Sequence, residues 1–185
     1  MQFGDPRTFS IEAQLEPDLQ APSAVWGRMC IWCDGTPIGD FSEEHCALYP
    51  SYQGFSELLA TLPTLWRTEF ESLDDTALWN LLDEKLYGFH GDVELEDDRS
   101  LEDTQRDWRV YSPHDFLTNW GESFDHGGKS FIFCTPSQQV LILNRHLPTE
   151  KGMRLTASLF HVVAAIRLFL RWFKTEAARL GHPVD

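Results

Sequence analysis

Cys30 and Cys33 have the Cys-x-x-Cys spacing that both redox pairs and zinc sites use. A redox pair needs both sulfurs on one side of a helix start, where the first thiolate is stabilised. Here the pair lies within an expected strand, in which a spacing of three places the sulfurs on opposite faces. A zinc site would also need a second close pair, whereas Cys46 and Cys134 stand alone. The sequence therefore predicts reduced, metal-free thiols.

The other chemically capable residues also lack a reactive arrangement. No two of the seven histidines have the i, i+4 spacing of a helical metal site. The stretch 126–130, His-Gly-Gly-Lys-Ser, lacks the leading glycine and the spacing of a phosphate-binding loop, so we expect a turn there. Carboxylates are abundant, but none is set apart by apolar surroundings as a general base would be. The patterns predict no catalytic residue, no metal and no cofactor.

Composition limits the class of protein. The 185 residues are 42% hydrophobic and 13% aromatic, which predicts one folded domain spanning residues 1–185. A net charge of −14 argues against nucleic-acid or anionic-membrane binding and suits a basic protein partner, although acidity can also serve solubility alone. Residues 1–5 lack a basic start and an apolar run, and no apolar run reaches about 18 residues, so we expect a cytoplasmic protein.

The acidic residues gather in the middle of the chain. Residues 69–107 hold fourteen acids and three bases, whereas eight bases face three acids from residue 126 onward. The densest part, 92–103, is a solvated loop, a ragged edge strand or a partner surface, and the two oppositely charged parts could also attract one another. From charge alone, with one tryptophan at the end of the stretch, the candidate partner-binding residues are Asp92, Glu94, Glu96, Asp97, Asp98, Glu102, Asp103 and Trp108.

A hairpin near the N-terminus is expected to organise the sheet. Residues 24–33 are apolar on both faces, which predicts a central strand covered on both sides. The Asp-Gly pair at 34–35 tolerates the positive φ of a type I′ turn, and in that register Trp32 faces Pro37. Because Pro37 has no N–H to donate outward, residues 36–40 are expected to form an edge strand.

Other strands follow from alternation or from apolar runs. Residues 8–15 alternate and predict a strand with one wet face. The runs 130–134 and 139–144 are apolar on both faces and predict an interior hairpin. Short strands are expected at 108–111 and 153–156.

The expected helices include one long element. Residues 159–180 carry apolar side chains at three- and four-residue spacing after Ser158, a suitable cap. A second helix is expected between an aspartate cap at 74 or 75 and Gly88, and a short third helix at 57–62. Residues 41–54 and 112–128 are expected to be irregular.

This order of elements predicts an α+β fold. It is an antiparallel sheet built from hairpins, with the long C-terminal helix packed on one face and shorter helices in the middle. The side chains singled out for its core are Trp26, Ile31, Trp32, Phe169 and Phe173.

Motifs at the two ends of the chain resemble immunity protein family 42 of bacterial polymorphic toxin systems. The N-terminal motifs are Gly4-x-Pro6-x-x-Phe9-x-Ile11 and Trp26-Gly27-x-x-Cys30-x-Trp32-x-x-Gly35-x-x-Ile38-Gly39-Asp40. The C-terminal motif runs from Ser158-x-x-x-His161 to Phe169-x-x-Trp172-Phe173. These turn glycines and core aromatics identify a fold more than a site, and no contact residue is carried over from them.

The resemblance implies a small cytoplasmic protein that binds and neutralises a cognate toxin domain without catalysis of its own. An acidic surface would suit the basic active-site or substrate surface of such a toxin. The alternatives are a small enzyme or ligand-binding domain with an aromatic-lined pocket, and a scaffold module.

Overall fold

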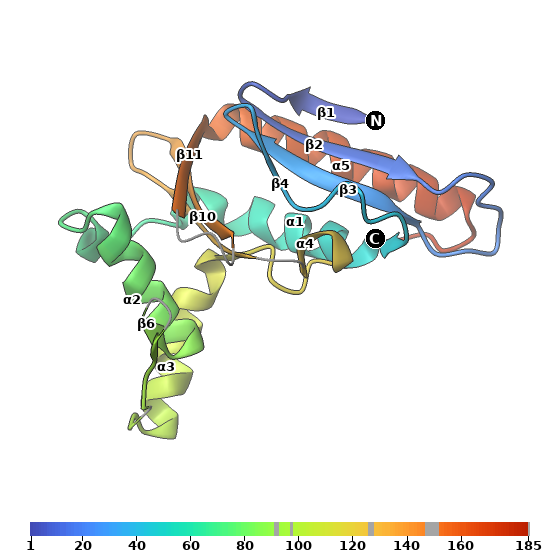
Figure 1. Ribbon diagram of the computed structural model, residues 1–185. Helices are drawn as coiled ribbons and strands as arrows, with labels where there is room; N and C mark the ends of the chain where they lie inside the picture. The colour runs from blue at the N-terminus through green and yellow to red at the C-terminus, as the bar shows by residue number, and fades with distance from the viewer. Residues whose placement is uncertain (91–92, 97, 126–127, 147–151, 185) are drawn as a thin grey trace.

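The computed structural model describes residues 1–90, 93–96, 98–125, 128–146 and 152–184 (Figure 1). A first antiparallel sheet has the order β1-β2-β3-β4, and β5 also pairs with β3. Its strands are β1 (Gln2–Asp5), β2 (Phe9–Leu15), β3 (Trp26–Cys33), β4 (Thr36–Ile38) and β5 (Cys46–Ala47).

A second antiparallel sheet has the order β11-β10-β9-β8. Its strands are β8 (Asp115–Phe116), β9 (Gly128–Cys134), β10 (Gln139–His146) and β11 (Gly152–Ser158). The helices are α1 (Tyr49–Thr61), α2 (Asp75–Tyr87), α3 (Leu101–Tyr111), α4 (Glu122–Asp125) and α5 (Leu159–Arg179). This α+β fold, with two larger sheets and a separate two-stranded one rather than a single sheet, confirms the predicted class.

The N-terminal hairpin forms in the predicted register. Asp34 and Gly35 have φ angles of 52° and 73°, as a type I′ turn requires, and Trp32 faces Pro37. Strand β4 is the edge of its sheet. The expectation that β3 is covered on both faces is half right, because Ile31 is fully buried whereas Trp26 and Trp32 are only half-buried.

Helix α5 forms as predicted and packs on β1, β2 and α1. Ser158 caps it, since its Oγ accepts a hydrogen bond from the backbone N–H of His161. Phe169 and Phe173 are buried, and Phe169 makes edge contacts with Phe3 and Phe55. The helix therefore closes the larger of the two hydrophobic cores.

The second sheet separates two cores, which explains why its hairpin is apolar on both faces. Ile132 and Ile142 point into the core beneath α5, whereas Phe131 and Leu143 belong to a second core with α2. Successive side chains of a strand point to opposite faces, so β9 and β10 supply both cores at once.

Two local predictions are wrong. Residues 41–54 were expected to be irregular and 57–62 to form a short helix, yet α1 runs from Tyr49 to Thr61 with Pro50 in its first turn. Pro is compatible with a first helical turn because its missing N–H would have no partner there. Residues 108–111 are the last turns of α3 rather than a strand.

The expected loop at 112–128 also contains a 3₁₀ turn, β8 and α4. Much of it is buried: Phe116 and Phe124 both belong to the core beneath α5. The stretch consists of several short elements in series. Each is too short for a periodic pattern of apolar residues to be detectable in the sequence.

We call residues 74–111 the arm. It consists of α2, the short hairpin of β6 (Phe89–His90) and β7 (Val93–Glu94), and α3. In Figure 1 the arm projects from the sheets at a steep angle to α5, with α3 beside α2. The acidic stretch of the sequence is therefore carried on a projecting element.

Candidate functional site

Helix α3 is a capped helix inside the acidic stretch. Ser100 Oγ accepts a hydrogen bond from the backbone N–H of Asp103 at 3.1 Å and donates one to its carboxylate at 2.6 Å. Glu102 and Asp103 lie in the first turn, where negative charge suits the helix dipole. The Ser-x-x-Asp spacing resembles the capping-box pattern, a signal that could have revealed this helix in the sequence.

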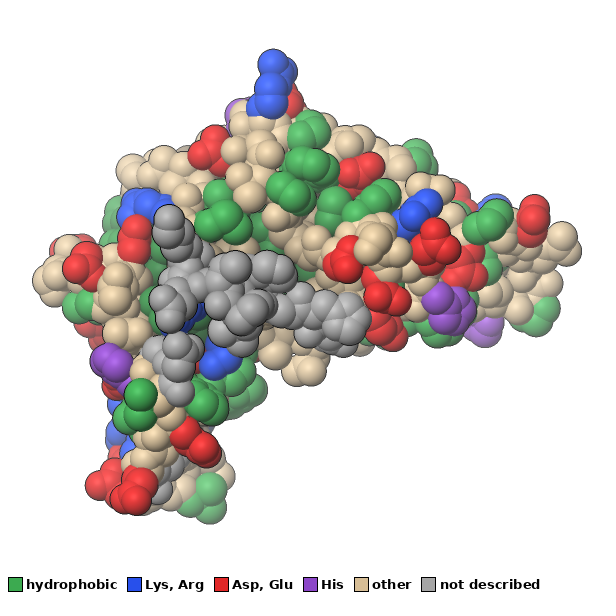
Figure 2. All heavy atoms as spheres, in the orientation of Figure 1, with side chains coloured by type: hydrophobic (Ala, Val, Ile, Leu, Met, Phe, Trp, Pro, Cys, Tyr) green, Lys and Arg blue, Asp and Glu red, His purple; other side chains and the backbone are tan. Residues whose placement is uncertain are grey.

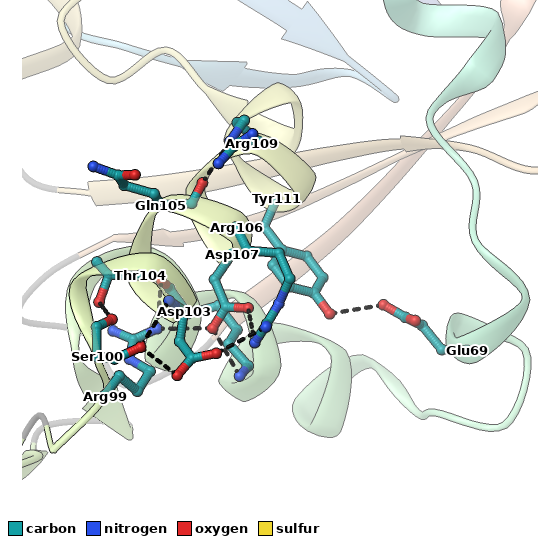
Figure 3. A network of polar contacts seen from close by, with 11 residues as sticks. Glu69, Arg99, Ser100, Asp103, Thr104, Gln105, Arg106, Asp107, Arg109 and Tyr111 are labelled. Carbon is teal, nitrogen blue, oxygen red and sulfur yellow. Dashed lines mark hydrogen bonds and ion pairs between the residues drawn. The ribbon is translucent and has the colours of Figure 1, made fainter.

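The inner face of α3 is held to α2 by a buried carboxylate (Figure 3). The Asp107 side chain is 8% exposed, and its Oδ2 lies 3.0 Å from Lys85 Nζ and 3.1 Å from Arg99 Nη1. Burial alone would raise the pKa of Asp107, but the hydrogen bonds from Lys85 and Arg99 hold it below its ordinary value. Asp107 therefore stays charged and joins α2, α3 and the segment between them.

The end of α3 is fixed to the segment before the arm. Tyr111 Oη donates a hydrogen bond of 2.8 Å to Glu69 (Figure 3). Glu69 also pairs with Arg67 at 2.8 Å. Burial raises the pKa of Tyr111 to about 12, so the phenol remains a donor. The end of α3 is thus tied to a segment outside the arm, whereas Ser100 caps its start from within the helix.

Attraction between the acidic and basic parts of the chain, one of the alternatives that the sequence left open, is present at the base of the arm. Lys129 Nζ on β9 lies 2.6 Å from the buried Asp83 carboxylate of α2 and sits 4.4 Å from the ring centre of Tyr87. Arg154 on β11 pairs with Asp75 at the start of α2. These pairs involve acids that precede the densest acidic stretch.

The candidate partner-binding residues have different environments. Asp92 and Asp97 lie outside the described residues. Asp103 is engaged within α3, where it pairs with Arg106 at 2.8 Å. The remaining four acids are exposed and form no ion pair with any residue that the structure describes; they are Glu94, Glu96, Asp98 and Glu102.

Part of this group converges on one surface. Glu84, Glu96 and Asp98 line a shallow hollow of about 150 Å³ together with Leu95. Lys85 and Arg99, the two cations that pair with Asp107, also line it. Acidic side chains are visible at the far end of the arm in Figure 2. The structure thus brings carboxylates from α2 and from the segment after β7 to one place.

The arm also exposes apolar side chains that charge-based reasoning missed. Leu101 is 74% exposed and Val93 is 64% exposed, and Trp108, the one apolar candidate, is 55% exposed. Leu101 and Trp108 are seven residues apart, which places them on one side of a helix. Recognising 101–111 as a helix would have revealed this pair.

The cysteines have the environments expected of buried hydrophobes. Cys33 joins the core, whereas Cys30 contacts Glu12 on the opposite face of the sheet. Burial raises the pKa of both thiols to about 12, which keeps them protonated. Within the described ranges, no three His, Cys, Asp or Glu side chains are grouped to hold a metal ion.

Aromatic side chains are sparse in the linings of the surface hollows, although Trp79 lines one of about 270 Å³ beside Leu143 and Arg154. One of about 410 Å³ lies between the sheets, beside Ile38, Phe124 and Met153, and one of about 550 Å³ lies beside Arg28 and His45. Neither is lined by tryptophan among the described residues. No described helix has both the length and the apolar character needed to cross a bilayer.

Comparison with known proteins adds independent information. The family model described as Immunity protein 42 matches residues 1–166. The crystal structure of CdiI from Burkholderia dolosa AUO158 is similar, with a TM-score of 0.64 and 14% sequence identity over 93% of this chain and 99% of that chain. At this identity the likeness concerns the fold. No curated protein matches the chain.

Proposed function

The chain belongs to the immunity protein 42 family, and we propose that it binds and neutralises a cognate toxin domain through the acidic end of its arm. An immunity function against a toxin follows from the family. The contact surface and the basic character of the partner are the proposal. The partner-facing residues are the candidates named from the sequence, with Glu94, Glu96, Asp98 and Glu102 contributing the charge and Trp108 an apolar contact.

The observation that carries the proposal is the set of unpaired carboxylates on a projecting, internally braced element. Acids elsewhere on the arm, such as Asp83 and Asp107, are neutralised by Lys129, Lys85 and Arg99. The exposed acids form no ion pair with a described residue, so their electric field extends into solvent. A field of this kind steers a basic partner and raises the association rate.

Neutralisation then requires no chemistry from this chain. A bound arm covers the basic active-site or substrate surface of the toxin domain and excludes its substrate. The protein acts in the cytoplasm as a stoichiometric inhibitor, with no cofactor, and neither nucleic acid nor a membrane is a partner.

The first test is protection in cells. Co-expression with the toxin domain encoded by the neighbouring reading frame should restore growth, and the purified proteins should form a complex. Wild-type protein that neither restores growth nor binds this toxin domain would contradict the proposed function.

The second test locates the charge effect. The double variant Glu96→Lys and Asp98→Lys should slow association, and the effect should shrink at high salt because exposed charges are screened beyond about 8 Å at physiological ionic strength. The matched control, Asp18→Lys with Glu57→Lys, changes net charge equally on exposed residues outside the arm. Equal slowing by both variants would show that only net charge matters, and no slowing by either would leave acidity with a solubilising role.

A further inference from the structure

We propose that α3 is the recognition helix of this protein and that Trp108 and Leu101 are the apolar anchors that the toxin domain buries. This inference rests on the proposed function. The apolar pair provides most of the binding affinity, and the carboxylates raise the association rate. The expected partner is a toxin surface with an apolar cleft, wide enough for an indole ring and rimmed by cationic side chains.

The two proposed anchors on α3 are exposed to solvent. All seven tryptophans lie in the described residues, and Trp108 is the one whose side chain is mostly exposed. Leu101 is 74% exposed on the same side of α3, about 10 Å away along the helix axis at 1.5 Å per residue. Large apolar side chains that face water in a group mark interaction sites, and tryptophan is enriched among residues that dominate binding.

The helix that presents Trp108 is braced before any partner binds. Trp108 directly follows Asp107, whose carboxylate is held by Lys85 of α2. Ser100 caps the start of α3, and Tyr111 at its end is bonded to Glu69. A side chain presented on a helix fixed at its start, middle and end loses little backbone freedom on binding, so more of its contact energy appears as affinity.

Polar and charged side chains surround the two anchors on α3. Glu102 follows Leu101, and Gln105 lies between the anchors on the exposed face. Arg109, beside Trp108, is exposed and directs its Nε to the backbone oxygen of Gln105. An apolar centre surrounded by polar and charged groups is the arrangement of a binding hot spot, where the rim excludes water from the centre. The cationic rim predicted for the toxin complements Glu102 and the acids before α3.

The experiment compares matched truncations against the toxin domain from the neighbouring reading frame. Trp108→Ala should weaken binding by about 30-fold or more, mostly through faster dissociation, and Leu101→Ala should act in the same direction. Trp108→Phe should recover part of the affinity. The control is Phe160→Ala, which removes an aromatic ring that is 76% exposed on α5 and should change affinity by less than about twofold.

The kinetic pattern separates anchors from steering charges. Trp108→Ala should leave the salt dependence of association unchanged, whereas Glu96→Lys with Asp98→Lys should alter it. Thermal melts should show that Trp108→Ala is folded. Independently of any variant, amide hydrogen exchange in residues 101–111 of the wild-type protein should slow when the toxin domain binds.

Three outcomes are distinguishable. A wild-type protein that fails to bind the toxin domain would overturn the proposed function and this inference together. Binding with wild-type affinity by a folded Trp108→Ala protein would overturn the inference alone. Binding without slower exchange in 101–111 would place the contact elsewhere and likewise overturn it.

Discussion

Lys85 Nζ on α2 and Asp107 Oδ2 on α3 lie 3.0 Å apart, and this contact joins the two helices of the arm. The carboxylate is almost wholly buried, and Arg99 reaches the same oxygen from the segment before α3. The Asp107 side chain therefore ties α3 to α2, beside the apolar contacts that Tyr111 and Val110 make in the second core. The exposed face of α3 depends on this inner contact.

Asp107→Ala should lower the free energy of unfolding by about 2 kcal/mol, because two cations lose a charged hydrogen-bond acceptor. Glu102→Ala is the control, since it removes an exposed carboxylate of the same helix that forms no ion pair with a described residue. Urea denaturation of the two variants measures the difference. Equal stability of the two proteins would show that the buried contact contributes little.

His114 should make stability depend on pH. Its side chain is 2% exposed and its Nδ1 donates to the backbone oxygen of Ile132 at 3.0 Å, and burial lowers its pKa. The unfolded chain therefore binds this proton more readily. The stabilisation is complete above about pH 6.5 and is lost as the pH falls through the lowered pKa of the folded state.

The measurement is the melting temperature of wild-type protein and of His114→Gln between pH 7.5 and 5, in about half-unit steps. The wild-type curve should fall more steeply below pH 6.5 than that of the variant. Parallel curves would mean that His114 is not the group responsible.

Gly54→Ala should destabilise the protein although alanine normally favours a helix by about 1 kcal/mol. A Cβ at Gly54 would lie 2.2 Å from a ring atom of Trp120, so helix α1 or the indole must shift. The expected net loss is about 1–3 kcal/mol. Gln53→Ala, at the exposed neighbouring position, should have little effect in the same denaturation experiment. A more stable Gly54→Ala protein would contradict the packing of Trp120 on α1.

Phe169→Ala should cost about 3–5 kcal/mol through lost contacts and a cavity, because Phe169 is fully buried between Phe3 and Phe55. Phe160→Ala on the exposed side of the same helix should change stability by under about 0.5 kcal/mol. Denaturant midpoints of the two variants provide the comparison. Similar midpoints would mean that α5 does not close the core.

Local signals in the sequence were sufficient for several elements. The Asp-Gly turn with its register to Pro37, the Ser158 cap and the apolar spacing of α5 each depend on residues close together in the chain. The same holds for strands β9 and β10, whose continuous apolar runs are visible in the sequence without any partner. The order of these elements predicted the α+β class. The motifs at the chain ends indicated the family.

Other elements depended on contacts that are distant in sequence. Residues 41–54 have no clear period, yet α1 begins at Tyr49 and includes Gly54, against which the Trp120 ring packs. The acidic stretch concealed α3, whose stabilising partners Lys85 and Glu69 lie well before it in the chain.

By itself, the sequence determined the fold class, the main hairpins, the long helix and the family, because capping, turn geometry and apolar periodicity act over a few residues. Only the tertiary structure decided which acids are neutralised inside the arm and which face solvent. It also decided that the helix face shared by Trp108 and Leu101 is exposed. Exposure and ion pairing depend on which surfaces meet when distant segments pack, and neither is encoded in local spacing.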